Sequence, residues 1–253
     1  MKFSRALPRL PAELLKALAI AKKDARVYYF QPQSLMMGIL FPIAMFFSFA
    51  IGRNLPGEAV IPGLMTITIL FASSSIGPLA VPMERRSKTY ERMIVAPISP
   101  LSILIGEICG GAIFGMIIAC VPLAIGVIFF SAGIRDPAGL IVGTLLVAFE
   151  FSAMGVMFSA IPTENPANAM MLVNLVRLPM IFVSGIFITA AQMGAFGWIA
   201  WLSPLTYGAD LFRFAASGQG QYGLITDGLG VVVFTALFLG LGVYLHERNR
   251  VAG

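Results

Sequence analysis

Six long apolar runs dominate this sequence of 253 residues. Each is close to the roughly 20 residues that a helix needs to cross a hydrocarbon core of about 30 Å. Lipid offers no partners to the backbone N–H and C=O groups, so a spanning segment must be helical. With 58% apolar residues, the chain also has too few polar side chains to cover a water-soluble globule. The sequence therefore predicts an all-α membrane protein with six transmembrane helices. The expected spans are Ser34–Ile51, Ile61–Val81, Ile108–Phe130, Gly139–Ile161, Ala169–Ile188 and Leu224–Leu245.

Basic residues predict the orientation of these spans. The first 33 residues, the loop after the second span and the C-terminal tail carry thirteen lysines and arginines, whereas the opposite loops carry three. Because basic loops stay in the cytoplasm, both termini are expected there, in a multi-pass protein of the cytoplasmic membrane. Topology thus explains the net charge of +5, and no nucleic acid partner is expected.

The N-terminal arm, residues 1–33, precedes a six-span transmembrane body at 34–253. A helix over residues 11–30 places an apolar stripe on one face, made of Leu14, Leu18, Ala21, Ala25 and Tyr28. Its lysines and arginines lie elsewhere, which favours an interfacial amphipathic helix that contacts membrane lipids. A soluble amphipathic arm is the alternative.

Pairs of glycines at four-residue spacing occur within the spans, as at Gly106/Gly110 and Gly111/Gly115. Small residues let helix backbones approach closely in lipid. These pairs predict a packed bundle and do not indicate a substrate.

No motif for catalysis or nucleotide binding accompanies the spans. The sequence contains no G-x-x-x-x-G-K-[ST] phosphate loop, no H-E-x-x-H motif and a single histidine, His246. We therefore expect no catalytic site, no metal and no cofactor bound by this chain.

Charged residues inside a span are costly and suggest function. Glu107 is expected at the edge of the third span, within reach of water, but Glu150 and Arg177 lie deeper in consecutive spans. They can form a structural ion pair, line a substrate path, or remain separate, with Arg177 reaching the cytoplasmic surface. Asn174, one turn before Arg177, can add a hydrogen bond in each case.

The fifth connection, residues 189–215, contains apolar pieces that are too short to span and too apolar to lie in water. Short re-entrant helices at the outer leaflet fit both properties. Aromatic residues around it predict an interfacial belt of Trp198, Trp201, Tyr207 and Tyr222.

The loop between the second and third spans places six charged residues in the nine positions from Glu84 to Arg92, in a chain that is 11% charged. A helix over 84–98 is amphipathic, with Tyr90 on its apolar side. The loop serves either as a positive-inside anchor or as a docking segment for a cytoplasmic partner.

Two motifs resemble the permease subunits of type-2 ATP-binding-cassette exporters. The segment ERRSKTYERMIVAPIS, residues 84–99, resembles E-R-x-x-G-T-x-E-R-L-x-x-T-P-I-S of that family, with Lys88 in place of glycine. The segment from Phe182 to Arg213 resembles F-L-S-G-I-F-F-P followed by N-P-L-T-Y and an arginine.

The resemblance implies a cytoplasmic coupling helix at 84–98 that docks into a separate ATPase. The residues of this helix that the resemblance implies in the contact with the ATPase are Glu84, Arg85, Arg86, Lys88, Thr89, Tyr90, Glu91 and Arg92. It further implies spans one, two and five at a dimer axis, with an outer gate and re-entrant segment. The gate residues are Phe182, Ser184, Gly185, Phe187, Pro204 and Tyr207.

The implied partners are two ATPase subunits, which hold the ATP and Mg, and a second permease copy or close paralogue. The implied activity is ATP-driven export of an amphipathic substrate, such as a drug, a lipid or a lipid-linked glycan. Two rivals remain open: an ion-coupled secondary transporter that uses Glu150 as proton carrier, and a membrane scaffold without transport activity.

Overall fold

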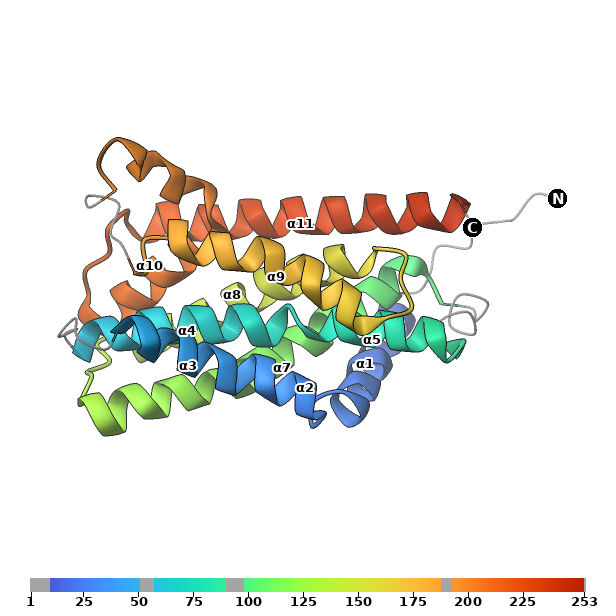
Figure 1. Ribbon diagram of the computed structural model, residues 1–253, viewed down its shortest axis with the longest axis horizontal. Coiled ribbons are helices and arrows are strands. Elements are labelled where there is room, and N and C mark those ends of the chain that lie inside the picture. The colour runs from blue at the N-terminus through green and yellow to red at the C-terminus, as the bar shows by residue number, and fades with distance from the viewer. Residues whose placement is uncertain (1–9, 51–56, 90–97, 188–192, 253) are drawn as a thin grey trace.

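The computed structural model describes residues 10–50, 57–89, 98–187 and 193–252. Long helices follow a common axis in this part of the chain, which contains no strand (Figure 1). Helix α1 and the last turn of α11 lie at the same end of the bundle, called here the terminal end; α10 lies near the other end, called the distal end. The elements are α1 (Leu10–Val27), α2 (Pro32–Leu35), η1 (Met36–Leu40), α3 (Phe41–Ala50), α4 (Gly57–Ser73), α5 (Ile76–Arg86), α7 (Pro100–Phe130), α8 (Pro137–Ser159), α9 (Pro166–Val183), η2 (Gly194–Leu202), α10 (Pro204–Ser217) and α11 (Leu224–Ala252).

The all-helical membrane architecture is confirmed. Five stretches of the described chain are long and apolar enough to cross a membrane, and a bent pair of helices makes up to six. The expected spans two to six correspond to α4–α5, α7, α8, α9 and α11. The third span begins earlier than expected, at Pro100, because Ser99 caps the helix by accepting a hydrogen bond from the Ser102 N–H.

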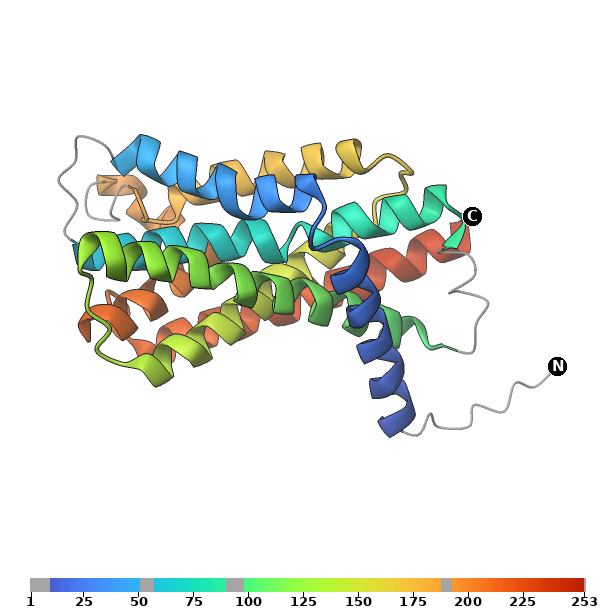
Figure 2. The same cartoon turned by 90° about the horizontal axis from the view of Figure 1, so that it is seen from below.

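The first span is the second member of this bent pair, after α1, and its helix is itself irregular. Residues Glu13–Val27 and Pro32–Ser48 meet at 92°, so α1 leaves the bundle steeply at the terminal end (Figure 2). The π-helical turn η1 follows, and the Phe41 N–H bonds to the Met36 carbonyl, five residues back. Pro42 comes next, and because proline has no N–H to donate, it favours such local rearrangements.

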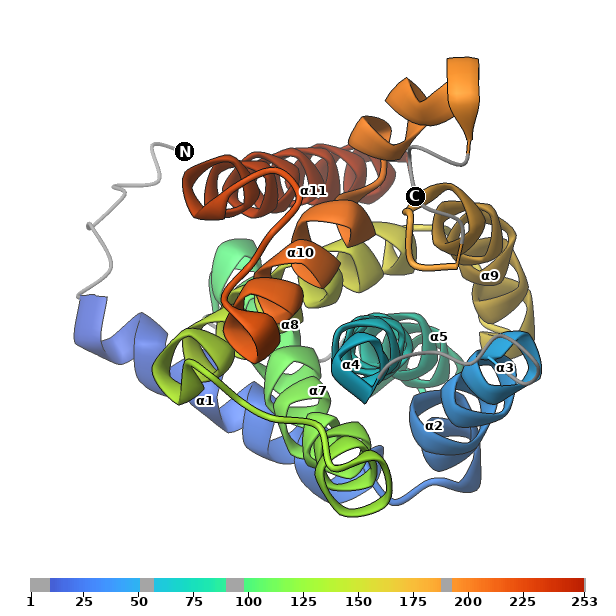
Figure 3. The same cartoon turned by 90° about the vertical axis from the view of Figure 1, so that its left-hand side faces the viewer.

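The second span is the centre of the bundle. Viewed along the bundle, α4 and α5 are surrounded by the other helices (Figure 3), and the most apolar window of this span is fully buried. The resemblance places this span at a dimer axis. In the single chain it is enclosed, so any path that it lines lies within the chain or opens as its neighbours separate.

A short break divides span two at Ser74 and Ser75. Both hydroxyls donate to carbonyls one turn back, those of Leu70 and Phe71, in competition with the helical ladder. Pro78, four residues after Ser74, cannot donate to the Ser74 carbonyl. These side chains explain why the helix stops and restarts inside the span.

Glycines bring the helix backbones into close contact, as the sequence predicts. A Cβ atom at Gly106 would lie 2.8 Å from the Ala17 carbonyl oxygen, so α1 packs directly on α7. A Cβ atom at Gly155 would lie 2.7 Å from both Cα and O of Ser74, so α8 packs on the break in span two. Contacts of this kind supply the packing that lipid cannot drive by hydrophobicity.

Gly155→Ala is expected to destabilise the bundle by about 1–3 kcal/mol, because the new methyl group meets backbone atoms that cannot rotate away. Gly240→Ala is the matched control, since a Cβ atom there meets nothing within 4 Å. Thermal unfolding in a mild detergent measures both variants. Equal melting temperatures for the two variants would contradict this packing.

Candidate functional site

The charged loop begins as a continuation of span two. Glu84, Arg85 and Arg86 form the last turn of α5, followed by a turn at Ser87 and Lys88. Of the predicted contact residues, Arg86, Lys88 and Thr89 are exposed. Tyr90, Glu91 and Arg92 lie outside the described residues, as does most of the expected coupling helix at 84–98.

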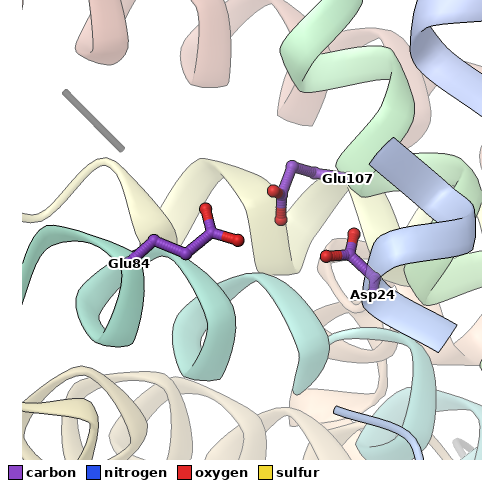
Figure 4. A group of neighbouring side chains, drawn as sticks. All are labelled: Asp24, Glu84 and Glu107. Atoms are coloured by element: carbon purple, nitrogen blue, oxygen red, sulfur yellow. The ribbon is translucent and has the colours of Figure 1, made fainter. Parts of the chain in front are cut away.

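Glu84 points into the protein instead of toward a partner. Its carboxylate lies beside those of Asp24 and Glu107, and the three side chains converge from α5, α1 and α7 (Figure 4). One oxygen from each lies within 4.8 Å of the others, and all three residues are at most 3% exposed. The expectation that Glu107 reaches water is wrong, because α7 extends beyond it and α1 covers it.

Lys23 of α1 supplies the cation for these carboxylates. Its Nζ forms an ion pair with Glu84, lies 3.0 Å from Asp24 Oδ1 and lies 3.5 Å from Glu107 Oε1. The Tyr28 hydroxyl also donates to Glu84, at 3.4 Å. We call Lys23, Asp24, Glu84 and Glu107 the ionic cluster.

Carboxylates at this spacing are also ligands that hard divalent cations accept. Here, however, the Lys23 ammonium already contacts all three carboxylates. The arrangement is therefore an ion-pair network between helices, with lysine as its cation.

Burial and charge shift the acid–base behaviour of the ionic cluster. Burial of Asp24, together with the nearby charge of Glu84, raises the pKa of the Asp24 carboxyl to about 7, against the opposing effect of Lys23. Burial alone would lower the pKa of Lys23, but the charges of Glu107, Asp24 and Glu84 raise it above its ordinary range. Lys23 thus stays charged, whereas Asp24 titrates near neutral pH.

The other half of α1 holds the far end of the same loop. Ser102, in the first turn of α7, donates a hydrogen bond to Glu13, and Lys16 lies 2.7 Å from the other Glu13 oxygen. These bonds lower the pKa of Glu13 to about 2. Helix α1 therefore contacts both α5, where the loop leaves, and α7, where it returns.

Arg85 connects the loop to another turn at the terminal end. Its Nη1 donates to the Ile161 carbonyl at 2.7 Å, in the connection between α8 and α9. Asn249 of α11 donates to the neighbouring Ala160 carbonyl at 2.5 Å. The end of span two is thereby linked to three further helices.

Lys88 occupies the position of the glycine in the resembling motif. Its φ of 55° lies in the left-handed region, which glycine adopts without strain and lysine adopts at a cost. The backbone here thus has a conformation that glycine favours, although the residue is lysine.

Glu150 and Arg177 do not form an ion pair among the described residues. Both are fully buried, and neither Glu150 oxygen has a hydrogen-bond partner. Arg177 does not reach the surface; its Nη1 donates to Asn174 Oδ1 at 3.2 Å, as expected, and its guanidinium lies 5.3 Å from the centre of the Phe71 ring.

The residues expected at the outer gate meet at the distal end. The Phe182 and Phe187 rings are 6.4 Å apart, and Gly185 between them has a φ of 81° that requires glycine. The Ser184 carbonyl accepts a hydrogen bond from Thr206 of α10 at 3.1 Å. Pro204 opens α10, and Tyr207 is buried in it, so the two parts of the second motif are in contact.

Sequence reasoning missed Lys23 and Asp24 as site residues. The signal was an acid within the basic run KKDAR, on the same face as Ala21 and Tyr28, which are also buried. The acids on either side of the loop, Glu84 and Glu107, were the remaining indication that carboxylates meet here.

Lys23→Gln is expected to destabilise the protein by about 3 kcal/mol, because it leaves buried carboxylates without their cation. Lys22→Gln, at the exposed neighbouring lysine, should have little effect. Thermal unfolding in detergent compares the two. If Glu84→Gln fails to recover part of the loss in the Lys23→Gln background, the proposed pairing is wrong.

The raised pKa of Asp24 predicts a pH effect. The folded protein binds the Asp24 proton more tightly than the unfolded chain, so this stabilisation is complete below about pH 4 and is lost as pH rises through about 7. Asp24→Asn resembles the protonated form. The variant should be closest to the wild type in melting temperature at pH 4 and exceed it by most at pH 8. Parallel pH profiles would refute the assignment.

Comparison with known proteins identifies the family of this chain. The ABC-2 type transporter family matches residues 16–216. The inner membrane transport permease YadH of Escherichia coli K12 is 23% identical over 201 residues, covering 76% of this chain and 75% of YadH. The probable multidrug ABC transporter permease YbhR of the same organism is 20% identical over 196 residues, covering 76% of this chain and 52% of YbhR. A match that runs from α1 through α10, over the broken first span and both motifs, means that the chain belongs to the ABC-2 type transporter family, as a membrane permease subunit.

Proposed function

We propose that this chain is the membrane-spanning half of an exporter, driven by a separate ATPase that docks on the loop between α5 and α7. The loop, the terminal end and both chain termini lie in the cytoplasm. ATP and Mg are bound by two ATPase subunits, and a second permease copy completes the transport path.

The main support for this proposal is that side chains of α1 bind residues at both ends of the loop. Lys23 forms an ion pair with Glu84 at the end of α5, and Glu13 accepts a hydrogen bond from Ser102 at the start of α7. A force on the loop therefore reaches α1, α5 and α7 together, since breaking a buried ion pair costs several kcal/mol. Arg85 extends the connection to the turn between α8 and α9.

Span two is the element that this force moves. Its last turn carries Glu84 and Arg85, and its body forms the centre of the bundle. Because its neighbours pack on it through glycines, a rotation of span two must rearrange them. Alternating access follows, with the Phe182–Phe187 segment as the gate at the outer face.

The substrate is an amphipathic molecule, such as a drug, a lipid or a lipid-linked glycan. The name of YbhR, a probable multidrug permease, supports this class. The spans themselves present few polar groups.

One observation favours a different function. Glu150 is fully buried without a hydrogen-bond partner, and such a carboxyl suits a proton carrier of an ion-coupled transporter. That function requires neither nucleotide nor a second polypeptide. Vesicles that hold only the purified chain separate the two functions, since uptake there without ATP would support the ion-coupled alternative.

Reversing charge on the exposed part of the loop, with Arg86→Glu and Lys88→Glu together, is expected to release the ATPase during co-purification. The two side chains are exposed and do not belong to the ionic cluster, so the bundle should stay folded, as measured by gel filtration. Lys22→Glu, an exposed lysine on α1, is the matched control and should retain the ATPase. Retention of the ATPase by the loop variant would refute docking at this segment.

A further inference from the structure

Arg177 is a buried cation that the proposed coupling pathway does not use. It lies eleven residues after Pro166, and so roughly 16 Å along α9 from the terminal end. Its exposed fraction is 0%, whereas Met171 and Leu175, on the outer side of α9, are 74% and 69% exposed. Its side chain therefore points into the bundle, toward Phe71 of span two.

Two contacts fix the guanidinium in place. Nη1 donates to Asn174 Oδ1 at 3.2 Å, and the ring of Phe71 lies 5.3 Å from Cζ. Such a cation–π contact orients the group but does not satisfy its N–H donors. Nε and Nη2 have no hydrogen-bond partner.

The two unsatisfied nitrogens share one edge of the guanidinium. This edge presents two parallel N–H groups, the arrangement that binds two oxygens of a carboxylate or phosphate at once. The hydrogen bond to Asn174 is made by Nη1 and does not use this edge. The residue thus has the geometry of an oriented anion receptor.

No acidic side chain in the described chain lies within 4.0 Å of Arg177. Glu150, the acid expected to pair with it, lies instead within electrostatic reach of Tyr207 on α10. An isolated charge in a membrane interior is costly. The counter-charge for Arg177 therefore has to come from a group other than the acidic side chains that the structure describes.

We propose that the side edge of Arg177 binds the anionic group, a phosphate or carboxylate, of an amphipathic substrate within the membrane. This inference rests on the proposed export function and assigns its substrate class. Phe71 and Asn174 act as positioning residues for the guanidinium. The site is closed in this structure, and the break of span two at Ser74 and Ser75 lies three residues after Phe71.

The test is a binding measurement on the purified chain in nanodiscs of phosphatidylcholine, with no ATPase present. The probes are fluorescent dioctanoyl phosphatidic acid and the matching neutral dioctanoylglycerol, and fluorescence anisotropy reports binding. The wild type is expected to bind the anionic probe about tenfold more tightly, the effect of one charge-assisted hydrogen-bonded pair.

Three variants assign the preference to Arg177. Arg177→Gln should remove it, and Arg177→Lys, which keeps a charge without the planar edge, should keep only part. Arg135→Gln, at an exposed arginine outside the spans, should leave it intact. Gel filtration and the melting temperature establish that each variant is folded, and Arg177→Lys tests the site if Arg177→Gln does not fold.

Two outcomes would overturn the inference. One is equal binding of the two probes by the wild type, or an undiminished preference in folded Arg177→Gln. The other is displacement of the anionic probe by inorganic phosphate at millimolar concentration, because the site would then take a free anion. Neither outcome affects association with an ATPase, and loss of that association would reject the export proposal without changing the binding preference.

Discussion

A buried charge in a low-dielectric interior must have a partner, and this requirement organises the terminal end of the molecule. Lys23 lies among three carboxylates from three helices, so none of these helices can move away without exposing an uncompensated charge. Glycines make the contact possible, because Gly106 lets the backbone of α1 approach α7. The helix α1, expected from the sequence to lie at the membrane surface, is therefore held to α5 and α7 by buried charges, and in the proposed export function it moves with them.

The centre of the bundle follows a different constraint. Span two is enclosed by its neighbours and interrupted by serines whose hydroxyls take up backbone carbonyls. At this interruption the serine hydroxyls and the surrounding helices keep the backbone groups away from lipid, which could not satisfy them. The charged loop thus continues directly from a core element that runs the length of the bundle and is interrupted near its middle.

The sequence predicted the spans well because their length and apolarity are local properties. It also predicted the glycine contacts and the hydrogen bond between Asn174 and Arg177, which depend on four- and three-residue spacings within a helix. It did not predict the ionic cluster, because Asp24 and Glu107 are brought together by the steep angle of α1, and no local pattern encodes that angle. It offered a pair between Glu150 and Arg177 that the described chain does not form, since depth in the membrane says nothing about the direction in which each side chain points.

The central claim is that α1 and the loop move as one body when the ATPase acts. Spin labels at the exposed positions Lys22 and Ser87 report the distance between them in the assembled complex, by double electron–electron resonance. The account predicts the same distance distribution with and without ATP, while the distance between the Lys22 positions of the two permease copies changes. A shift in the Lys22–Ser87 distance on addition of ATP would show that the ionic cluster opens during the cycle and would contradict the account.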